Sequence, residues 1–124
     1  MTVILLSSLL LMHELSLLED VLTIIENNAE SQGYKAVKKV CLEIGVLSCV
    51  EPEALRFGFE IVMKNSLAEG ASLEIVTMPG EAICEQCDHE MKIYALHTPC
   101  SECQSFSLKV ISGMEMRVRD LIVN

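Results

Sequence analysis

The sequence contains no tryptophan and few aromatic residues, with two Tyr and three Phe among 124 residues. Because hydrophobic residues still make up 51% of this globular composition, the core must be built mainly from aliphatic side chains. Basic residues are also scarce: nine Lys and Arg stand against 18 Asp and Glu, which gives a formal net charge of −9. Nucleic-acid binding depends on neutralising phosphates, so a chain this acidic is a poor candidate for it.

No Lys or Arg precedes Lys35, although the first twelve residues are almost wholly apolar. A secretory signal needs a basic start and a small-residue cleavage site, and the sequence has neither. A membrane-spanning helix needs about 20 apolar residues, whereas His13 and Glu14 interrupt this run. The sequence therefore predicts a cytoplasmic protein that does not bind a membrane.

Common catalytic motifs are absent as well. The chain has no G-x-S-x-G nucleophile motif, no phosphate-binding P-loop and no HExxH zinc motif. We therefore expect a binding protein and no enzyme.

Apolar residues recur at helical spacing over residues 15–29, which predicts an amphipathic helix with one buried face. Ser16 and Glu19 have the spacing of a capping box and place the helix start near Ser16, and Gly33 suits its end. Residues 12–14 would then form an arm ahead of the helix. The alternative is one continuous helix that extends back into the apolar segment.

Alternating apolar residues predict three strands, at residues 40–44, 73–77 and 114–123. A second helix is predicted to start at residues 48–52, with Pro52 in its first turn, where proline is tolerated. Two helices cannot cover both faces of a broad parallel sheet. We therefore expect an α+β fold, with a small sheet of about three strands, two helices and an inserted zinc-ribbon module.

Four of the six cysteines form two Cys-x-x-Cys pairs that are twelve residues apart: Cys84, Cys87, Cys100 and Cys103. Two such turns direct four sulfurs to one centre, in the tetrahedral shell that structural Zn(II) adopts. A stretch with so few apolar residues needs such an ion to fold. We predict a zinc-binding module at residues 81–107, inserted into an α+β domain formed by residues 1–80 and 108–124.

Other uses of the thiols stay open at this stage. One pair could be a redox dithiol, iron could occupy the same four-sulfur set, and disulfides would require an oxidising compartment. Cys41 and Cys49 stand apart from the pairs and are predicted to be buried as small apolar side chains. His89 and His97 flank the module's cysteines, either as solvated loop residues or as secondary ligands.

Several segments taken together point to one family: MHELSL at 12–17, LEIG at 42–45, LSCVE at 47–51, RFGFEIV at 56–62, AEGA at 68–71 and both cysteine pairs. On these segments the chain resembles the HypA/HybF family, nickel metallochaperones of [NiFe]-hydrogenase maturation. The resemblance extends from Met12 onward and is closest to the HybF branch.

The resemblance implies a nickel site at an amino terminus formed by Met12. Its amine, the following amide nitrogen and the imidazole of His13 would bind Ni(II), with Glu14 adjacent and needed for metal handling. Glu51 is a weaker additional candidate. Imidazole suits nickel, and an exposed site can release its cargo.

The resemblance also implies the partners: a HypB-like GTPase and the [NiFe]-hydrogenase large subunit that receives the nickel. Zinc would be structural, and the chain a monomer or weak homodimer. The alternative function is a zinc-ribbon adaptor between proteins, which would carry one zinc and no nickel.

Residues 1–11 depart from the family pattern. If they are present, the nitrogen of Met12 is a peptide amide, which must lose a proton before it can bind metal. We therefore expect residues 1–11 to be a non-functional extension, so that the working chain starts at Met12 and has 124 − 11 = 113 residues.

Overall fold

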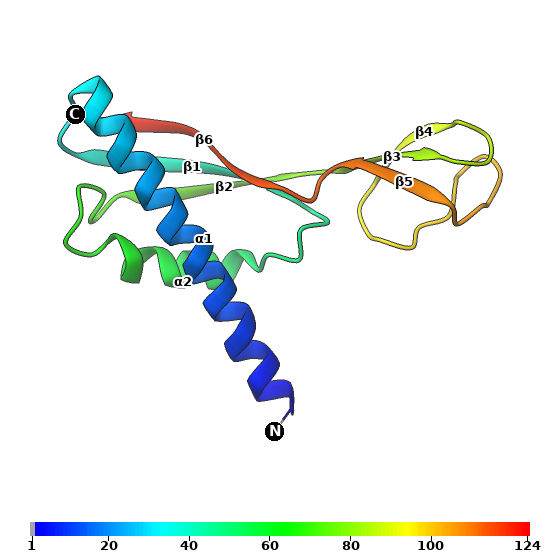
Figure 1. The fold of residues 1–124 in the computed structure, drawn as a ribbon, viewed down its shortest axis with the longest axis horizontal. Helices are drawn as coiled ribbons and strands as arrows, with labels where there is room; N and C mark the ends of the chain where they lie inside the picture. Colours follow the sequence, from blue (N-terminus) through cyan, green and yellow to red (C-terminus); the bar gives the residue numbers. More distant parts are fainter. Residues whose placement is uncertain (1) are drawn as a thin grey trace. The chain divides into compact units, whose positions relative to one another are not determined.

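The computed structural model describes the backbone of residues 2–124 and the side chains of residues 14–124. Its elements, labelled in Figure 1, are α1 (Thr2–Gln32), β1 (Val37–Gly45), α2 (Pro52–Met63), β2 (Ser72–Met78), β3 (Gly80–Cys84), β4 (Glu90–Ile93), β5 (Leu108–Ser112) and β6 (Met116–Val123). The strands form two three-stranded sheets, in the orders β2-β1-β6 and β4-β3-β5. The predicted α+β fold, with two helices, a small sheet and an inserted module, is confirmed.

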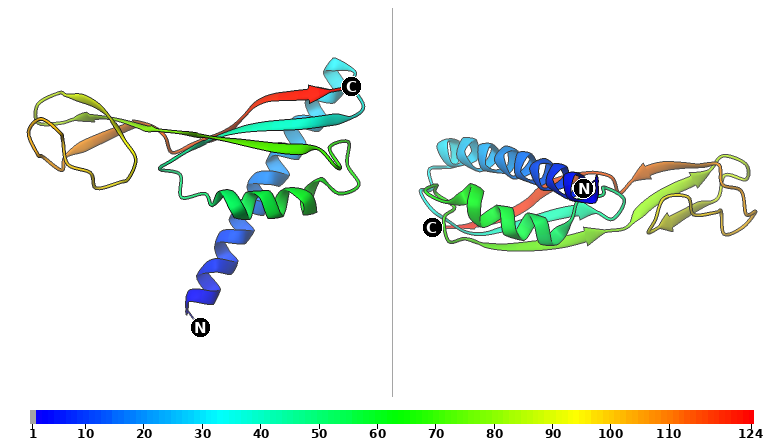
Figure 2. Two further views of the ribbon diagram at one scale, coloured as in Figure 1. Left: turned by 180° about the vertical axis from the view of Figure 1, so that it is seen from behind. Right: turned by 90° about the horizontal axis from the view of Figure 1, so that it is seen from below.

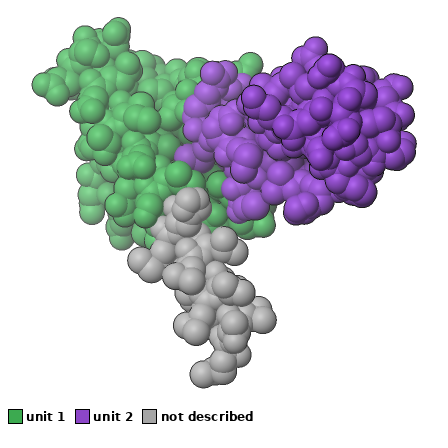
Figure 3. Space-filling model, turned by 45° about the vertical axis from the view of Figure 1, so that its right-hand side comes forward, with its two compact units in different colours: residues 1–42, 50–75, 118–124 green, residues 43–49, 76–117 purple. Residues whose placement is uncertain are grey.

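The chain divides into two compact units, which Figure 3 shows in different colours. Unit 1 comprises residues 1–42, 50–75 and 118–124, and unit 2 comprises residues 43–49 and 76–117. The predicted division of function, with nickel at residues 1–80 and 108–124 and zinc at residues 81–107, stays a prediction.

Helix α1 ends as the sequence predicts but does not begin where the sequence predicts. Gly33 follows it with φ 79°, and its N–H donates to the carbonyl oxygen of Ala29 over 2.7 Å. The predicted start near Ser16 is wrong, because α1 runs from Thr2 and Ser16 lies inside it. The leucine and methionine residues before Ser16 favour helix, so the backbone ahead of Ser16 is helical too. Ser16 therefore does not lie at a helix end and cannot act as its cap. Of the helices in the described part, none is long and apolar enough to cross a membrane.

The core of unit 1 is mainly aliphatic and contains one phenylalanine, as the composition requires. Its buried apolar side chains from α1, β1 and α2 are Leu18, Val21, Ile25, Val37, Val40, Cys41, Leu42, Leu55, Phe59 and Met63. The two helices, adjacent in Figures 1 and 2, pack closely at Gly58. A Cβ atom there would lie 2.9 Å from Cδ2 of Leu15 and 3.0 Å from Cδ1 of Leu18. Helix α2 begins at Pro52, at the end of the segment predicted to start it.

Strand β1 is the central strand of the first sheet. The N–H of Gly45 donates to the carbonyl of Glu115 over 2.9 Å, and the N–H of Asn124 donates to that of Ala36 over 3.1 Å. The end of β1 thus meets the start of β6, so these two strands are antiparallel. Strands β1 and β2 are joined through α2, the kind of crossover that parallel strands require.

The second sheet is antiparallel, with Glu81 opposite Lys92 and Ala82 opposite both Met91 and Val110. Its apolar cluster has three buried residues, Leu47, Ala82 and Ile93, with Val46, Met91, Leu108 and Val110 packed against them and partly buried. None of its three strands was predicted individually. They are short, and such a small core leaves little apolar alternation in the sequence.

Three glycines lie together in unit 2, where the chain approaches and leaves the second sheet. A Cβ atom on Gly45 would lie 2.0 Å from the carbonyl oxygen of Gly113, and one on Gly113 would lie 2.5 Å from Cα of Gly80. The N–H of Leu47 also donates to the carbonyl of Gly113 over 2.9 Å. These backbones are therefore too close to admit a side chain.

We expect Gly45→Ala to lower the free energy of unfolding by at least about 3 kcal/mol, because its methyl group would overlap backbone that is fixed by hydrogen bonds. Gly33→Ala is the matched control. Its Cβ atom would meet nothing within 4 Å, so its cost is that of the left-handed φ, about 1–2 kcal/mol. Thermal unfolding followed by circular dichroism measures both variants, and an equal loss in both would contradict the crowding at Gly45.

Candidate metal centre

The four paired cysteines come together in unit 2, as predicted. Their Sγ atoms all lie within 4.8 Å of one another. The sulfurs of Cys84 and Cys103 are 3.5 Å apart, and those of Cys87 and Cys100 are 3.6 Å apart. Zinc–sulfur bonds of about 2.3 Å in a tetrahedral site give sulfur–sulfur edges of about 3.8 Å. The donor set therefore fits a single tetrahedral ion.

The first cysteine pair lies in a turn that follows directly from β3. The N–H of Asp88 donates to the carbonyl of Cys84 over 2.9 Å, and the N–H of Cys84 donates to the carbonyl of His89 over 2.9 Å. The N–H of Gln86 donates to the sulfur of Cys84 over 3.4 Å. This backbone network fixes the turn and directs N–H dipoles at a sulfur that would carry negative charge.

The second pair repeats the same turn between β4 and β5. The N–H of Gln104 donates to the carbonyl of Cys100 over 2.9 Å, and the N–H of Cys100 donates to that of Ser105 over 2.8 Å. The N–H of Glu102 donates to the sulfur of Cys100 over 3.4 Å. In both turns the residue after the second cysteine has a positive φ, 62° at Asp88 and 66° at Gln104.

The thiols within a pair differ in acidity. Burial raises the pKa of Cys84, but the N–H groups of Cys87 and Gln86 outweigh it and bring the pKa down to about 7. The N–H of His89 lowers the pKa of Cys87, but burial and the neighbouring sulfurs raise it to about 12. Four adjacent thiolates repel one another, so a bound cation is needed to displace the remaining protons.

A four-sulfur site of this kind suits a structural ion. All four ligand positions of a tetrahedral ion would be filled by the protein, so no position is left for a reacting water. Cys84 and Cys100 are buried, whereas Cys87 and Cys103 are exposed. Each turn thus contributes one inner and one outer sulfur.

All six cysteines are free thiols, so the structure contains none of the disulfides considered as an alternative. Cys41 is buried, as predicted, and its thiol lies 3.7 Å from Oε1 of Glu74. The prediction for Cys49 is wrong. It is exposed, with φ 62° in the loop after β1, because the chain turns there toward α2 and its side chain leaves the core.

Neither histidine of the module joins the sulfur cluster in the described residues, since the potential metal group consists of the four cysteines alone. His89 contributes its backbone carbonyl to the first turn. His97 has φ 66° and lines a pocket with Leu96 and Phe106.

The candidate nickel residues lie at the edge of the described part. The side chains of Met12 and His13 lie outside the described residues. Glu14 is fully buried in unit 1, and its Oε1 accepts a hydrogen bond from the N–H of Glu51 over 3.2 Å. Glu51 is the N-cap residue of α2, and its own side chain makes no capping hydrogen bond. The structure thus links two of the acidic candidates through one backbone contact.

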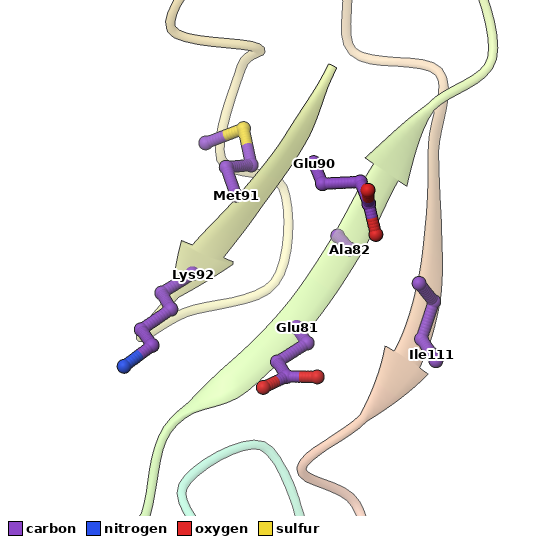
Figure 4. A pocket seen from close by; sticks show the side chains of 6 residues that line it. All are labelled: Glu81, Ala82, Glu90, Met91, Lys92 and Ile111. Atoms are coloured by element: carbon purple, nitrogen blue, oxygen red, sulfur yellow. The ribbon is translucent and has the colours of Figure 1, made fainter. Parts of the chain in front are cut away.

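The surface of the second sheet has a hollow of about 390 Å³, shown in Figure 4. It is lined by Glu81, Ala82, Glu90, Met91, Lys92 and Ile111. None of the predicted metal ligands lines it. Figure 4 shows the carboxylates of Glu81 and Glu90 over β3, with the ammonium group of Lys92 pointing away from them.

Sequence reasoning missed the residues that shape the two cysteine turns. The residue type at Asp88 is compatible with a positive φ, since Asp tolerates this conformation in turns. The residue type at Gln104 gives no such indication, because glutamine has no preference for a positive φ. Its φ follows from the hydrogen bonds of the turn, which the cysteine spacing alone does not reveal.

Comparison with known proteins identifies similar chains of nearly the same length. The profile of one family, described as "Hydrogenase/urease nickel incorporation, metallochaperone, hypA", matches residues 12–123. A hydrogenase maturation factor HypA from Acidithiobacillus ferrooxidans is 48% identical over 112 residues, which are 90% of this chain and 99% of the relative. A second relative, HypA 2 from Bradyrhizobium diazoefficiens, is 46% identical over 113 residues and is covered completely.

Solved structures show the same fold. The solution structure of the Ni metallochaperone HypA from Helicobacter pylori superposes with a TM-score of 0.66 at 27% identity, covering 89% of this chain and 96% of that one. Another solution structure, of a HypA protein, has a TM-score of 0.69 at 29% identity and covers 91% and 97% of the two chains.

Proposed function

Because this chain belongs to the HypA family of nickel metallochaperones for hydrogenase maturation, we propose that it binds Ni(II) through the amine of Met12 and the imidazole of His13, with Glu14 beside them. A metallochaperone carries its metal and catalyses no reaction. The observation that supports this site is the starting point of the family match, which falls on Met12. Residues 1–11 precede the match, and we propose that they form no part of the functional site.

The chemistry of the amino end supports such a site. An α-amino group titrates near pH 8, so it is available as a neutral donor at small cost near neutral pH. Together with the imidazole of His13 and a backbone nitrogen it gives nickel a nitrogen-rich set, which this metal accepts. Few ligands and an open position allow the ion to pass to another protein.

We assign zinc to the four-cysteine site and a structural role to that zinc. The cysteines would supply thiolates, which are soft donors that zinc accepts in tetrahedral geometry. Bound zinc would hold the two turns together in a unit whose apolar cluster has only three buried residues. The zinc site would thus stabilise the fold, and the nickel site would bind the metal that the protein carries.

The partners belong to the same proposal. A HypB-like GTPase would work with the carrier, and the [NiFe]-hydrogenase large subunit would receive the nickel. The six free thiols suit a reducing compartment, so we place the protein in the cytoplasm.

The test is equilibrium dialysis against Ni(II) of the zinc-loaded chain that begins at Met12, with both metals counted; wild type here means this chain without a substitution. We expect wild-type protein to hold one nickel and one zinc, and His13→Ala to keep its zinc and lose its nickel. His89→Ala is the matched control, since it removes an imidazole from the cysteine module and should leave nickel binding unchanged. Equal nickel binding by His13→Ala and wild type would refute the site, and zinc without nickel in wild type would favour an adaptor.

A further inference from the structure

Unit 2 exposes two of the five Phe and Tyr side chains in the sequence: Phe106 is 71% exposed and Tyr94 is 67% exposed. Scattered apolar residues are common on protein surfaces and need no explanation. Phe106, however, lines a hollow of about 200 Å³, the Phe106 hollow, together with His97 and the exposed Leu96. Exposed apolar side chains thus gather at one place on the unit that contains the four paired cysteines.

The Phe106 hollow reaches down to the apolar cluster of unit 2. Its deeper lining consists of Ile93, which is buried, and of Leu108 and Val110, which are partly buried. A pocket for a drug-sized molecule has a volume of about 300–1,000 Å³, so a hollow of about 200 Å³ suits one side chain better. Its size and lining therefore favour a single apolar side chain as the occupant.

Backbone hydrogen bonds to both cysteine turns fix the position of Phe106. The N–H of Cys100 donates to the carbonyl of Ser105 over 2.8 Å, and the N–H of Glu85 donates to that of Ser107 over 2.8 Å. These two serines are the residues on either side of Phe106. An aromatic side chain on a backbone held in this way loses little conformational freedom when a partner covers it, which favours binding.

The opposite wall of the hollow is held by a turn. The hydroxyl group of Thr98 donates to the carbonyl of Ala95 over 2.6 Å and so closes the turn that carries Leu96 and His97. His97 has a φ of 66° in this turn. Both walls of the Phe106 hollow are therefore built into the fold of unit 2.

The surroundings of Phe106 are acidic. Unit 2 contains seven Asp and Glu residues against three Lys and Arg residues. Glu85 and Glu102 are exposed, and they lie in the two cysteine turns whose backbones bond to the neighbours of Phe106. Four thiolates around one Zn(II) would add further negative charge. Because interfaces pair surfaces of opposite charge, a partner at this place should carry basic groups.

We propose that the Phe106 hollow docks a segment of a partner protein in which one apolar side chain is flanked by Lys or Arg. The apolar side chain fills the hollow against Phe106, and the basic groups face Glu85 and Glu102. A second copy of this acidic chain or an anionic membrane surface would bring like charges together, which opposes binding. The proposal concerns the cysteine module alone, so it goes beyond the nickel site and does not depend on it.

The probe is a library of short synthetic peptides, each with one central Leu, Ile, Met or Phe flanked by Lys or Arg. Each peptide is titrated into the full zinc-loaded chain, and amide signals in two-dimensional NMR spectra report binding. We expect saturable shifts centred on residues 94–98 and 104–108. A library with Glu in place of Lys and Arg, and one with Ser in place of the central apolar residue, should give none.

Variants of the chain test which residues carry the binding. Phe106→Ser should weaken binding of the tightest peptide by at least about tenfold, as truncation of a central aromatic anchor does. Leu96→Ser should act in the same direction and serves as the second variant if Phe106→Ser does not fold, which zinc content and signal dispersion reveal. Phe57→Ser is the matched control, because it removes a phenylalanine that is 61% exposed but lies in unit 1.

The electrostatic part is tested separately. Replacing Glu85 and Glu102 together by Gln keeps their backbone hydrogen bonds and removes two charges. We expect this change to weaken peptide binding about fivefold, the size expected for two exposed ion pairs. High salt should weaken binding to the wild-type chain in the same way, because it screens exposed charges.

Several results would overturn the proposal. One is the absence of saturable shifts throughout the basic library, and another is equal binding by wild type, Phe106→Ser and Leu96→Ser. Sedimentation that shows a dimer of wild type but not of Phe106→Ser would make a second copy the occupant. Binding to phosphatidylserine vesicles that Phe106→Ser loses would make it a membrane. Each of these outcomes leaves the nickel titration unaffected, so this failure is distinguishable from failure of the proposed function.

Discussion

Removing zinc should unfold the sheet β4-β3-β5 while the core of unit 1 stays folded. The apolar cluster of unit 2 is small: it has three buried residues, Leu47, Ala82 and Ile93, and four partly buried residues packed against them. A structural four-ligand zinc site contributes about 10–16 kcal/mol in small zinc-binding peptides, far more than such a cluster provides. Unit 1 has its own aliphatic core, built from both helices and β1. The loss of structure is therefore expected to be confined to one unit.

The variant Cys100→Ser should reproduce this effect, because Cys100 is a buried member of the sulfur cluster. Cys49→Ser is the matched control, since Cys49 is exposed and lies outside the cluster. Zinc content and amide signals in two-dimensional NMR spectra report both variants. Dispersed signals from residues 76–117 in zinc-free protein would contradict the structural role of the metal.

The segment 1–11 should weaken nickel binding by at least about a hundredfold. Changing a group that only supports a metal ligand lowers metal affinity by about 10- to 100-fold, and here a ligand itself is lost. With these residues present, the nitrogen of Met12 is a peptide amide and no longer an amine. The amine binds nickel after losing a proton near pH 8, whereas an amide holds its proton far more strongly. A chain that starts at Met1 would then bind nickel mainly through the imidazole of His13.

A chemical control separates the loss of the amine from other effects of the apolar segment. Acetylation of a chain that begins at Met12 blocks the amine and adds no leucines. Its nickel affinity should fall as far as that of the longer chain. If acetylation has no effect while the longer chain binds poorly, the apolar segment interferes by covering the site.

The sequence alone predicted the elements whose signals are local. The spacing of the cysteines predicted their cluster, Gly33 predicted the end of α1, and Pro52 predicted the start of α2. Each of these depends on one or two residues with strong conformational or chemical preferences, so neighbouring structure did not override them.

The remaining features depend on contacts between distant segments. Ser16 has the spacing of a helix cap, but the preceding backbone is helical as well. The burial of Glu14 depends on the start of α2, which lies 37 residues away. The close approach at Gly45 likewise requires Gly113 beside it. None of these pairings leaves a pattern in the local sequence.

The most direct measurement of the nickel site is native mass spectrometry of two zinc-loaded proteins after exposure to Ni(II), one starting at Met1 and one at Met12. Each mass reports the chain, its zinc and its nickel together. We predict one zinc on both chains, and one nickel on the chain with Met12 as its amino terminus at nickel concentrations that leave the longer chain unloaded. Equal nickel loading of the two chains would contradict a nickel site built on the amine of Met12.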